Sequence, residues 1–347
     1  MNELKIVEHG GVVKQVRSKE YNYDFNRETG FFARCGKDFA EDPLWAPGPE
    51  IADVEISTIC NMGCPYCYKS NTPQGKNMSL ETLKVLITKI DTKKLLTQVA
   101  FGLGATAEEN PDLWAMCDWL RGQGIIPNGT VANITDATAD KISSKFGACA
   151  VSFHGSKDLC YNSVKKLTDR GMKQANIHHV IHSGNFEETL GLIHDIKTDP
   201  RLSELNAIVL LSLKVKGRAV GNAFKPLSQE KFSILASELT KSGINFGMDS
   251  CSSHKYMSFV KTTDLLTEDE KLRHTMMVEP CESQSIFSSY FNVNAEYFPC
   301  SFAEGIVPAV KVLDCKDFIS EVWDGPAMTD MRNRALACNR DCLFFKI

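Results

Sequence analysis

Several features that define other classes of protein are missing from this chain of 347 residues. It contains no run of about 18 apolar residues, so we expect no membrane-spanning helix. The opening stretch MNELKIVEHG lacks the apolar segment that targets proteins for secretion, which predicts a cytoplasmic protein. The formal net charge of −4 gives no strong signal for nucleic-acid binding through phosphate neutralisation. A hydrophobic content of 43% excludes global disorder.

Cysteine, by contrast, is abundant, with 13 residues that are unevenly distributed. Cys60, Cys64 and Cys67 lie close together, and Cys117 and Cys149 lie in apolar stretches typical of the core. Five more follow late in the chain: Cys281, Cys300, Cys315, Cys338 and Cys342. Without a signal peptide, secretory disulfides are not expected, so metal or redox chemistry is the leading explanation.

Strand-like and helix-like segments alternate from about residue 50 onward. The expected strands are 52–58, 97–104, 125–134, 148–155, 175–182, 206–217 and 244–250. The expected helices are 80–91, 112–124, 161–171, 186–196 and 228–243. Apolar strands separated by amphipathic helices indicate an α/β fold with a parallel sheet covered by helices. In such sheets the chemistry gathers at the carboxyl ends of the strands.

The segments on either side of this series differ from it. Residues 1–50 contain possible short hairpins and a Pro-rich approach, and 51–254 carry the strand and helix series. Residues 255–347 are expected to be irregular and too short for an ordinary core. A bound cluster would therefore be needed to hold this last segment together.

The motif that carries chemistry is STICNMGCPYCYK, which directly follows the first expected strand. Cys60 and Cys64 are separated by three residues, and Cys64 and Cys67 by two. Three thiolates this close can bind three irons of a 4Fe–4S cube and leave the fourth iron open. Zinc is the rival metal, but it usually takes four ligands, and no nearby His or Cys completes a tetrahedron.

This spacing, with Tyr66 directly before the last cysteine, resembles the radical S-adenosylmethionine (SAM) superfamily. The resemblance implies a partial (β/α)6 TIM-like barrel whose open iron chelates the amine and carboxylate of SAM. It further implies that an electron from a flavodoxin- or ferredoxin-type reductant cleaves SAM. The 5′-deoxyadenosyl radical formed then abstracts a substrate hydrogen.

The second expected strand ends where this family commonly has a Gly-Gly-Glu-Pro motif that holds the SAM amino group. Gly102 and Gly104 match the glycines, but Ala105 stands where the glutamate is expected. Glu108 or Glu109 could take its place, or backbone carbonyls could suffice.

Other strand ends resemble further SAM contacts of the family. On this basis we assign Tyr66, Ser152 (in VSFHG) and Asn185 (in HSGN) to cofactor binding. His154 is either a group that orients substrate or a partly exposed turn residue. The paired His178 and His179 point to opposite faces of a strand, so at most one faces the site.

The C-terminal cysteines resemble the auxiliary-cluster extensions of one branch of this superfamily. Cys281 and Cys300 are expected to flank a β-hairpin that turns at Asn294–Ala295, and CNRDC supplies Cys338 and Cys342. The twitch form of the extension binds one 4Fe–4S cluster with four cysteines, and the longer SPASM form binds two with about seven.

With five cysteines available, one auxiliary cluster fits, and the resemblance assigns Cys281, Cys300, Cys338 and Cys342 as its ligands. Cys315 lies outside the matching segments. The segment with Trp323 and Arg332 resembles the stretch between the ligands. The alternative for this region is a set of separate buried thiols.

Cys251 and Asp249 follow the last expected strand, in GMDSCSSH. Cys251 is a candidate catalytic thiol, as a hydrogen-atom donor or a substrate contact, unless it is simply buried. Asp249 is a candidate base or substrate hook.

The substrate that we favour is a ribosomally synthesised peptide (RiPP), because peptide maturases populate the auxiliary-cluster branch. The outcome would be a cross-link, a C–C scission or splicing, or an epimerisation. No leader-recognition module is apparent, so a separate protein is expected to present the peptide. The alternatives are a dehydrogenase or mutase of a sugar, nucleoside or cofactor precursor, and a non-catalytic Fe–S electron carrier.

Overall fold

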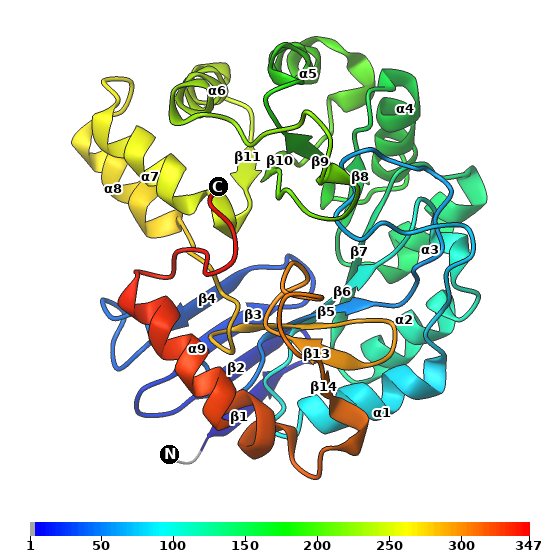
Figure 1. The fold of residues 1–347 in the computed structure, drawn as a ribbon, viewed down its shortest axis with the longest axis vertical. Coiled ribbons are helices and arrows are strands. Elements are labelled where there is room, and N and C mark those ends of the chain that lie inside the picture. Colours follow the sequence, from blue (N-terminus) through cyan, green and yellow to red (C-terminus); the bar gives the residue numbers. More distant parts are fainter. Residues whose placement is uncertain (1–3) are drawn as a thin grey trace.

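The computed structural model describes residues 4–347, and its centre is a ten-stranded sheet (Figure 1). Seven parallel strands form its main part in sequential order. They are β5 (Ile51–Glu55), β6 (Gln98–Gly102), β7 (Ile126–Val131), β8 (Cys149–Ser152), β9 (Ala175–Ile181), β10 (Ala207–Ser212) and β11 (Phe246–Met248). Each overlaps an expected strand, so the α/β class and the parallel sheet are confirmed.

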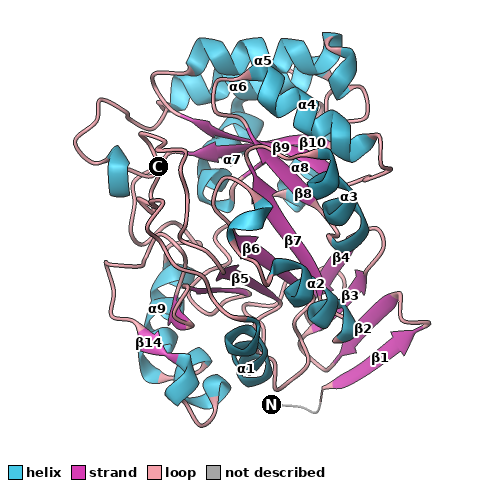
Figure 2. Cartoon of the chain, turned by 90° about the vertical axis from the view of Figure 1, so that its right-hand side faces the viewer, coloured by secondary structure: helices cyan, strands magenta, loops and turns pink. Residues whose placement is uncertain are grey.

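A helix connects each of these strands to the next, and Figure 2 shows these helices on the outside of the sheet. They are α1 (Leu80–Ile90), α2 (Leu113–Gly122), α3 (Asp136–Lys145), α4 (Lys157–Thr168), α5 (Phe186–Thr198) and α6 (Gln229–Ser242). In α1, the Ser79 side chain caps the first turn by accepting the N–H of Thr82, and the buried face packs on the sheet. The sequence did not predict α3, because its apolar face is short.

The sheet is open, with β11 at one edge and three strands of the C-terminal segment beyond β5 at the other. Strand β12 (Ser288–Phe291) pairs with β5 in parallel, β13 (Glu296–Phe298) pairs with β12 in antiparallel, and β14 (Val310–Lys311) follows. The predicted hairpin is therefore present. Its turn places Ala295 at φ +58°, in the left-handed region that favours Gly.

The expectation of an irregular C-terminal tail is wrong in part. Beyond residue 250 the chain forms α7 (Ser253–Thr262), α8 (Glu268–Met277) and α9 (Pro326–Ala337). Helix α8 buries none of its residues, so its sequence lacks the periodic apolar pattern that predicts a helix. The sequence feature that indicates this helix is the capping box of Thr267 and Glu270.

A separate four-stranded antiparallel sheet precedes β5, as the predicted hairpins require. Its strands are β1 (Lys5–His9), β2 (Val13–Arg17), β3 (Asn22–Asn26) and β4 (Phe32–Cys35). Lys14 donates to the carbonyl of Leu96 at 3.0 Å, and Tyr23 donates to that of Leu95 at 2.7 Å. Both carbonyls lie just before β6. This sheet therefore covers the amino ends of the parallel strands and leaves their carboxyl ends open.

None of the helices in residues 4–347 combines the length and the apolar character needed to cross a bilayer.

Trp323 joins the C-terminal segment to the chain that leads into β5. Its side chain is fully buried, and its indole N–H donates to the carbonyl of Ala46 at 2.9 Å. We expect Trp323→Ala to lower the free energy of unfolding by about 3–5 kcal/mol, measured by urea unfolding. Leu313→Ala, at a side chain that is 39% exposed, is the control and should cost far less. Equal losses in both variants would contradict this packing role.

Candidate functional site

The three clustered cysteines lie in the loop that joins β5 to α1, at the carboxyl end of the first parallel strand. The N–H of Cys60 donates to the carbonyl of Thr72 at 3.0 Å, and that of Cys67 donates to the carbonyl of Cys64 at 3.2 Å. Burial, followed by the charges of Cys67 and Cys60, raises the pKa of the Cys64 thiol. The three thiols are therefore close enough to influence one another electrostatically.

Two glycines allow neighbouring segments to approach this loop closely. A Cβ on Gly104 would lie 2.0 Å from the carbonyl oxygen of Ile59. Gly217 has φ +60°, and a Cβ there would lie 2.5 Å from the carbonyl oxygens of Cys67 and Tyr68. The loops after β6 and β10 therefore press against the backbone of the cysteine loop, with no room for side chains between them.

Tyr66 and His154 form a polar contact beside Cys64. The Tyr66 hydroxyl lies 2.7 Å from Nδ1 of His154, and the Cys64 sulfur lies 3.8 Å from the same nitrogen. Burial lowers the pKa of His154, so its imidazole is neutral near pH 7. These contacts favour a positioning role for His154 over that of an exposed turn residue.

His178 and His179 point to opposite faces of β9. His179 lies 3.0 Å from the Thr189 hydroxyl on α5, and Nδ1 of His178 lies 3.3 Å from the Thr130 hydroxyl on β7. Burial lowers the pKa of both to about 4, so neither carries charge near neutral pH.

The residues predicted to contact SAM lie at the carboxyl ends of the strands. Gly102 ends β6, and Ser152 ends β8. Asn185 lies at the start of α5, where its amide donates to the Val180 carbonyl and accepts the His182 N–H, both at 2.8 Å. These internal bonds hold the turn between β9 and α5, and the predicted SAM contacts stay predictions.

The two glutamates considered as replacements at position 105 bond to the protein itself. The Glu109 carboxylate accepts the N–H groups of Ala105 at 3.2 Å and Thr106 at 2.9 Å. Glu108 accepts the hydroxyl of Thr138. In this arrangement both carboxylates shape the loop after β6.

A cavity of about 310 Å³ lies between the cysteine loop, the ends of β10 and β11, and the C-terminal segment. Tyr66 and Tyr68, on either side of Cys67, form part of its wall. Four cysteines also line it: Cys251, Cys281, Cys300 and Cys342. Cys338 does not line this cavity and is exposed, so three of the four predicted auxiliary ligands gather there together with Cys251.

Backbone N–H groups lie close to two of these cysteines. The N–H of Ala303 donates to the Cys300 carbonyl at 3.0 Å. The Cys342 sulfur accepts the N–H of Phe345 at 3.4 Å. Such donors stabilise a thiolate, and they are one of the means by which proteins tune Fe–S clusters.

Cys251 and Cys342 both line the cavity, close enough for each to shift the pKa of the other. Cys251, with the Phe344 and Phe345 N–H groups, lowers the pKa of Cys342, while Cys342 and burial raise the pKa of Cys251. Lys214, only 5% exposed, pairs with Asp249, and its charge acts on the Cys251 sulfur.

Asp53 and Lys214 are cavity residues that the sequence reasoning missed. Asp53 is exposed to the cavity, where partial desolvation raises its pKa to about 6. Lys214 interrupts the largely apolar segment NAIVLLSLKVKG, and a charged residue in such a segment was the available signal. Asp53 lies in ADVEIST, where polar and apolar residues alternate, so nothing marked it.

The two groups of cysteines, the three in the loop after β5 and the four around the cavity, suit iron–sulfur clusters better than single metal ions. Within residues 4–347, no three or more His, Cys, Asp or Glu side chains are grouped to hold one metal ion. A 4Fe–4S cube differs, because each thiolate binds a different iron. Both groups offer soft sulfur donors, which select iron–sulfur clusters over hard cations.

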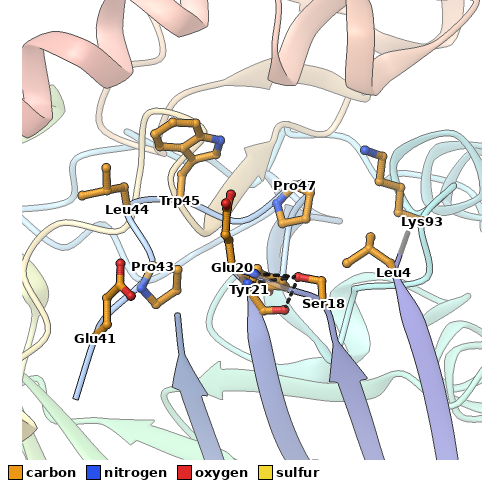
Figure 3. Close-up of a pocket in the computed structure, with 10 residues that line it drawn as sticks. All are labelled: Leu4, Ser18, Glu20, Tyr21, Glu41, Pro43, Leu44, Trp45, Pro47 and Lys93. Carbon is orange, nitrogen blue, oxygen red and sulfur yellow. Dashed lines mark hydrogen bonds between the residues drawn. The ribbon is translucent and has the colours of Figure 1, made fainter. Parts of the chain in front are cut away.

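A larger cavity of about 580 Å³ lies beside the amino-terminal sheet (Figure 3). Trp45 and Leu44 line one part of it, and Leu4 and Lys93 another. None of its lining residues is a cysteine or histidine. The smaller cavity, which adjoins both cysteine groups, is therefore the candidate site.

The chain was compared with family models, with curated proteins and with solved structures, and only the solved structures match it. No family model matches the chain, and no curated protein matches it by sequence. Streptococcus suis SuiB bound to its precursor peptide SuiA is similar, with a TM-score of 0.71 and 12% identity over 95% of this chain and 90% of SuiB.

Two further structures are similar. SuiB bound to S-adenosylmethionine matches with a TM-score of 0.63 and 14% identity over 82% of this chain and 68% of SuiB. The enzyme anSMEcpe, with AdoMet and a Kp18Cys peptide, matches with a TM-score of 0.53 and 13% identity over 77% and 79%.

The chain has the fold of the radical SAM enzymes, which is the fold class that the resemblance in the sequence implied. The likeness to SuiB extends over nearly the whole chain.

Close packing at Gly104 is directly testable. We expect Gly104→Ala to lower the free energy of unfolding by about 1–3 kcal/mol, because the new methyl group meets the Ile59 carbonyl. The control is Gly122→Ala, at the end of α2, where a Cβ meets nothing within 4 Å. Thermal unfolding that shows both variants equally stable would refute the close approach.

The reactivity of Cys342 should follow its lowered pKa in the metal-free chain. We expect iodoacetamide labelling of Cys342 to reach half its maximal rate at a lower pH than that of an ordinary thiol, because the thiolate is the nucleophile. Cys251→Ala removes the neighbouring thiol and should move this midpoint to higher pH, whereas Cys315→Ala should not. Mass spectrometry of the labelled peptides measures the rates, and an unmoved midpoint in Cys251→Ala would argue against this influence of Cys251.

Proposed function

We propose that this protein is a radical SAM enzyme that modifies a ribosomally synthesised peptide with the help of one auxiliary 4Fe–4S cluster. The observation that carries the proposal is the cysteine triplet at the carboxyl end of β5, beside a cavity lined by four more cysteines. We also infer that the wall from β5 to β11 is a partial (β/α) barrel, since its strands run in sequential parallel order.

Cys60, Cys64 and Cys67 would hold the SAM-binding cluster. With SAM, that cluster supplies a 5′-deoxyadenosyl radical, which abstracts a hydrogen atom from the substrate. Gly102, Gly104, Ser152 and Asn185 remain the proposed SAM contacts, together with Tyr66.

The protein's own groups would position the substrate and its protons in the cavity. Lys214 and Asp249 form a buried ion pair on its wall, which orients polar groups that enter. Asp53 has a pKa of about 6, so at neutral pH its carboxylate is mostly ionised and able to accept a proton. Tyr66 and Tyr68 line the side of the cavity that faces the cysteine loop.

A peptide substrate is supported by two comparison structures. SuiB was solved with its precursor peptide, and anSMEcpe with a Kp18Cys peptide. A cavity of about 310 Å³ has room for a side chain of a peptide rather than for a folded segment. A separate recognition protein and a flavodoxin- or ferredoxin-type reductant complete the proposal.

A second candidate is a small-molecule radical SAM dehydrogenase or mutase. The specific observation that favours it is the modest size of the cavity together with its charged groups, Asp53 and the Lys214–Asp249 pair. Such groups could anchor a sugar, nucleoside or cofactor precursor.

Anaerobic reconstitution tests the radical chemistry. We expect about eight irons per chain and release of 5′-deoxyadenosine from SAM under a strong reductant. Cys60→Ala should lower the rate of release at least 100-fold, because one iron loses its thiolate. Cys315→Ala is the matched control and should retain the rate. A Cys60→Ala variant that still cleaves SAM would overturn the assignment.

The substrate class can be tested separately. A precursor peptide encoded beside this gene should increase 5′-deoxyadenosine formation and return with a mass change, which is read by mass spectrometry. Asp53→Asn, close in size but unable to accept the proton, should slow this modification at least tenfold while leaving substrate-free SAM cleavage unchanged. Turnover with a sugar or nucleoside and none with the peptide would favour the small-molecule candidate.

A further inference from the structure

Four cysteines from three distant parts of the chain share one cavity. Cys251 lies in the turn Ser250–Ser252 that follows β11, and Cys281 and Cys300 lie on either side of the β12–β13 hairpin. Cys342 lies in the last loop. The N–H of Cys281 donates to the carbonyl of Arg340 at 3.3 Å, which holds the last loop against the hairpin.

Cys338 has the surroundings of an ordinary surface thiol. Its S–H donates to the carbonyl of Ala335 at 3.3 Å and reaches that of Asp341 at 3.8 Å. In the cavity, the Cys342 sulfur instead accepts the N–H of Phe345 at 3.4 Å. The ligands of one cluster must surround a common space, and Cys338 is exposed and lies outside the cavity that the other four cysteines line.

Cys251 has the surroundings that Cys338 lacks. It lies in the cavity wall together with Cys342 and with Lys214, whose charge acts on its sulfur. Asp249 pairs with the same ammonium. A thiolate at Cys251 would therefore be half-buried, close to a cation and among the other candidate ligands.

The backbone explains why neighbours in sequence separate in space. Between Cys338 and Cys342, Asn339 has φ +55° and Arg340 has φ +61°. Two successive left-handed residues reverse the chain, so the Cys342 sulfur faces the cavity while Cys338 stays at the end of α9 on the outside.

We propose that Cys251 is the fourth ligand of the auxiliary cluster, with Cys281, Cys300 and Cys342, and that Cys338 is not a ligand. This inference rests on the proposed function, because it needs a cluster at the cavity. It assigns Cys251 to metal binding in place of hydrogen-atom donation. The cluster would then tie the last loop of the chain to the end of β11.

The test uses the full chain with Cys60, Cys64 and Cys67 all changed to Ala, so that only auxiliary iron can bind. After anaerobic reconstitution with ferrous iron and sulfide, this background should bind about four irons and show an EPR signal on reduction. Added Cys251→Ala should lose at least half of this iron. Added Cys338→Ala should keep all of it, as should the control Cys315→Ala.

Other outcomes overturn the proposal in distinguishable ways. Iron loss in Cys338→Ala, with or without loss in Cys251→Ala, would return Cys338 to the ligand set. A background variant without iron would exclude a cluster at the cavity. If the unaltered chain still binds about four irons and cleaves SAM, the radical SAM function would nevertheless stand.

A second measurement does not depend on the folding of any variant. In the iron-loaded, otherwise unaltered chain, iodoacetamide labelling of Cys251 and Cys342 should slow at least tenfold relative to the metal-free chain. Cys338 should react equally in both. Protection of Cys338 together with free reaction of Cys251 would overturn the assignment.

Discussion

The geometry of the candidate site depends on the way the cysteine loop is held by Arg218. The loop between β5 and α1 lacks regular structure around its three cysteines, so few of its backbone carbonyls are satisfied by a ladder. Arg218 donates to the carbonyls of Cys64 at 2.8 Å and Asn71 at 2.9 Å, and its own N–H donates to that of Cys67 at 3.0 Å. Because Arg218 follows β10, the segment after this strand holds the cysteine loop that follows β5.

A second set of contacts joins this loop to the C-terminal segment. Lys69, two residues after Cys67, pairs with Glu55 at 3.1 Å and also with Glu304. The ring of Tyr68 lies 4.4 Å from that of Phe302, between centroids. The segment after Cys300 is thus fixed to the segment after Cys67. The two cysteine groups are therefore joined by direct side-chain contacts.

The sequence predicted the parts of the molecule whose physical cause is local. The apolar strands and the helix after β5 belong to this class, and so does the hairpin that turns at Ala295. Helix α8 was not predicted, because it buries no residue and its sequence therefore has no periodic apolar pattern. The grouping of Cys251 with Cys342 could not be read from spacing, because it depends on two left-handed residues and on a loop that returns from α9.

The pairing of β12 with β5 has a consequence for how the chain is made. The Ser289 hydroxyl bonds to the carbonyl of Ile51, a residue 238 positions earlier. On the ribosome, one edge of β5 therefore stays open until β12 has been synthesised. An uncovered parallel edge is slow to pair and invites association with other chains. Synthesis of β12 is thus the step after which this edge can be covered, and the same step brings Cys281 and Cys300 to the cysteine loop.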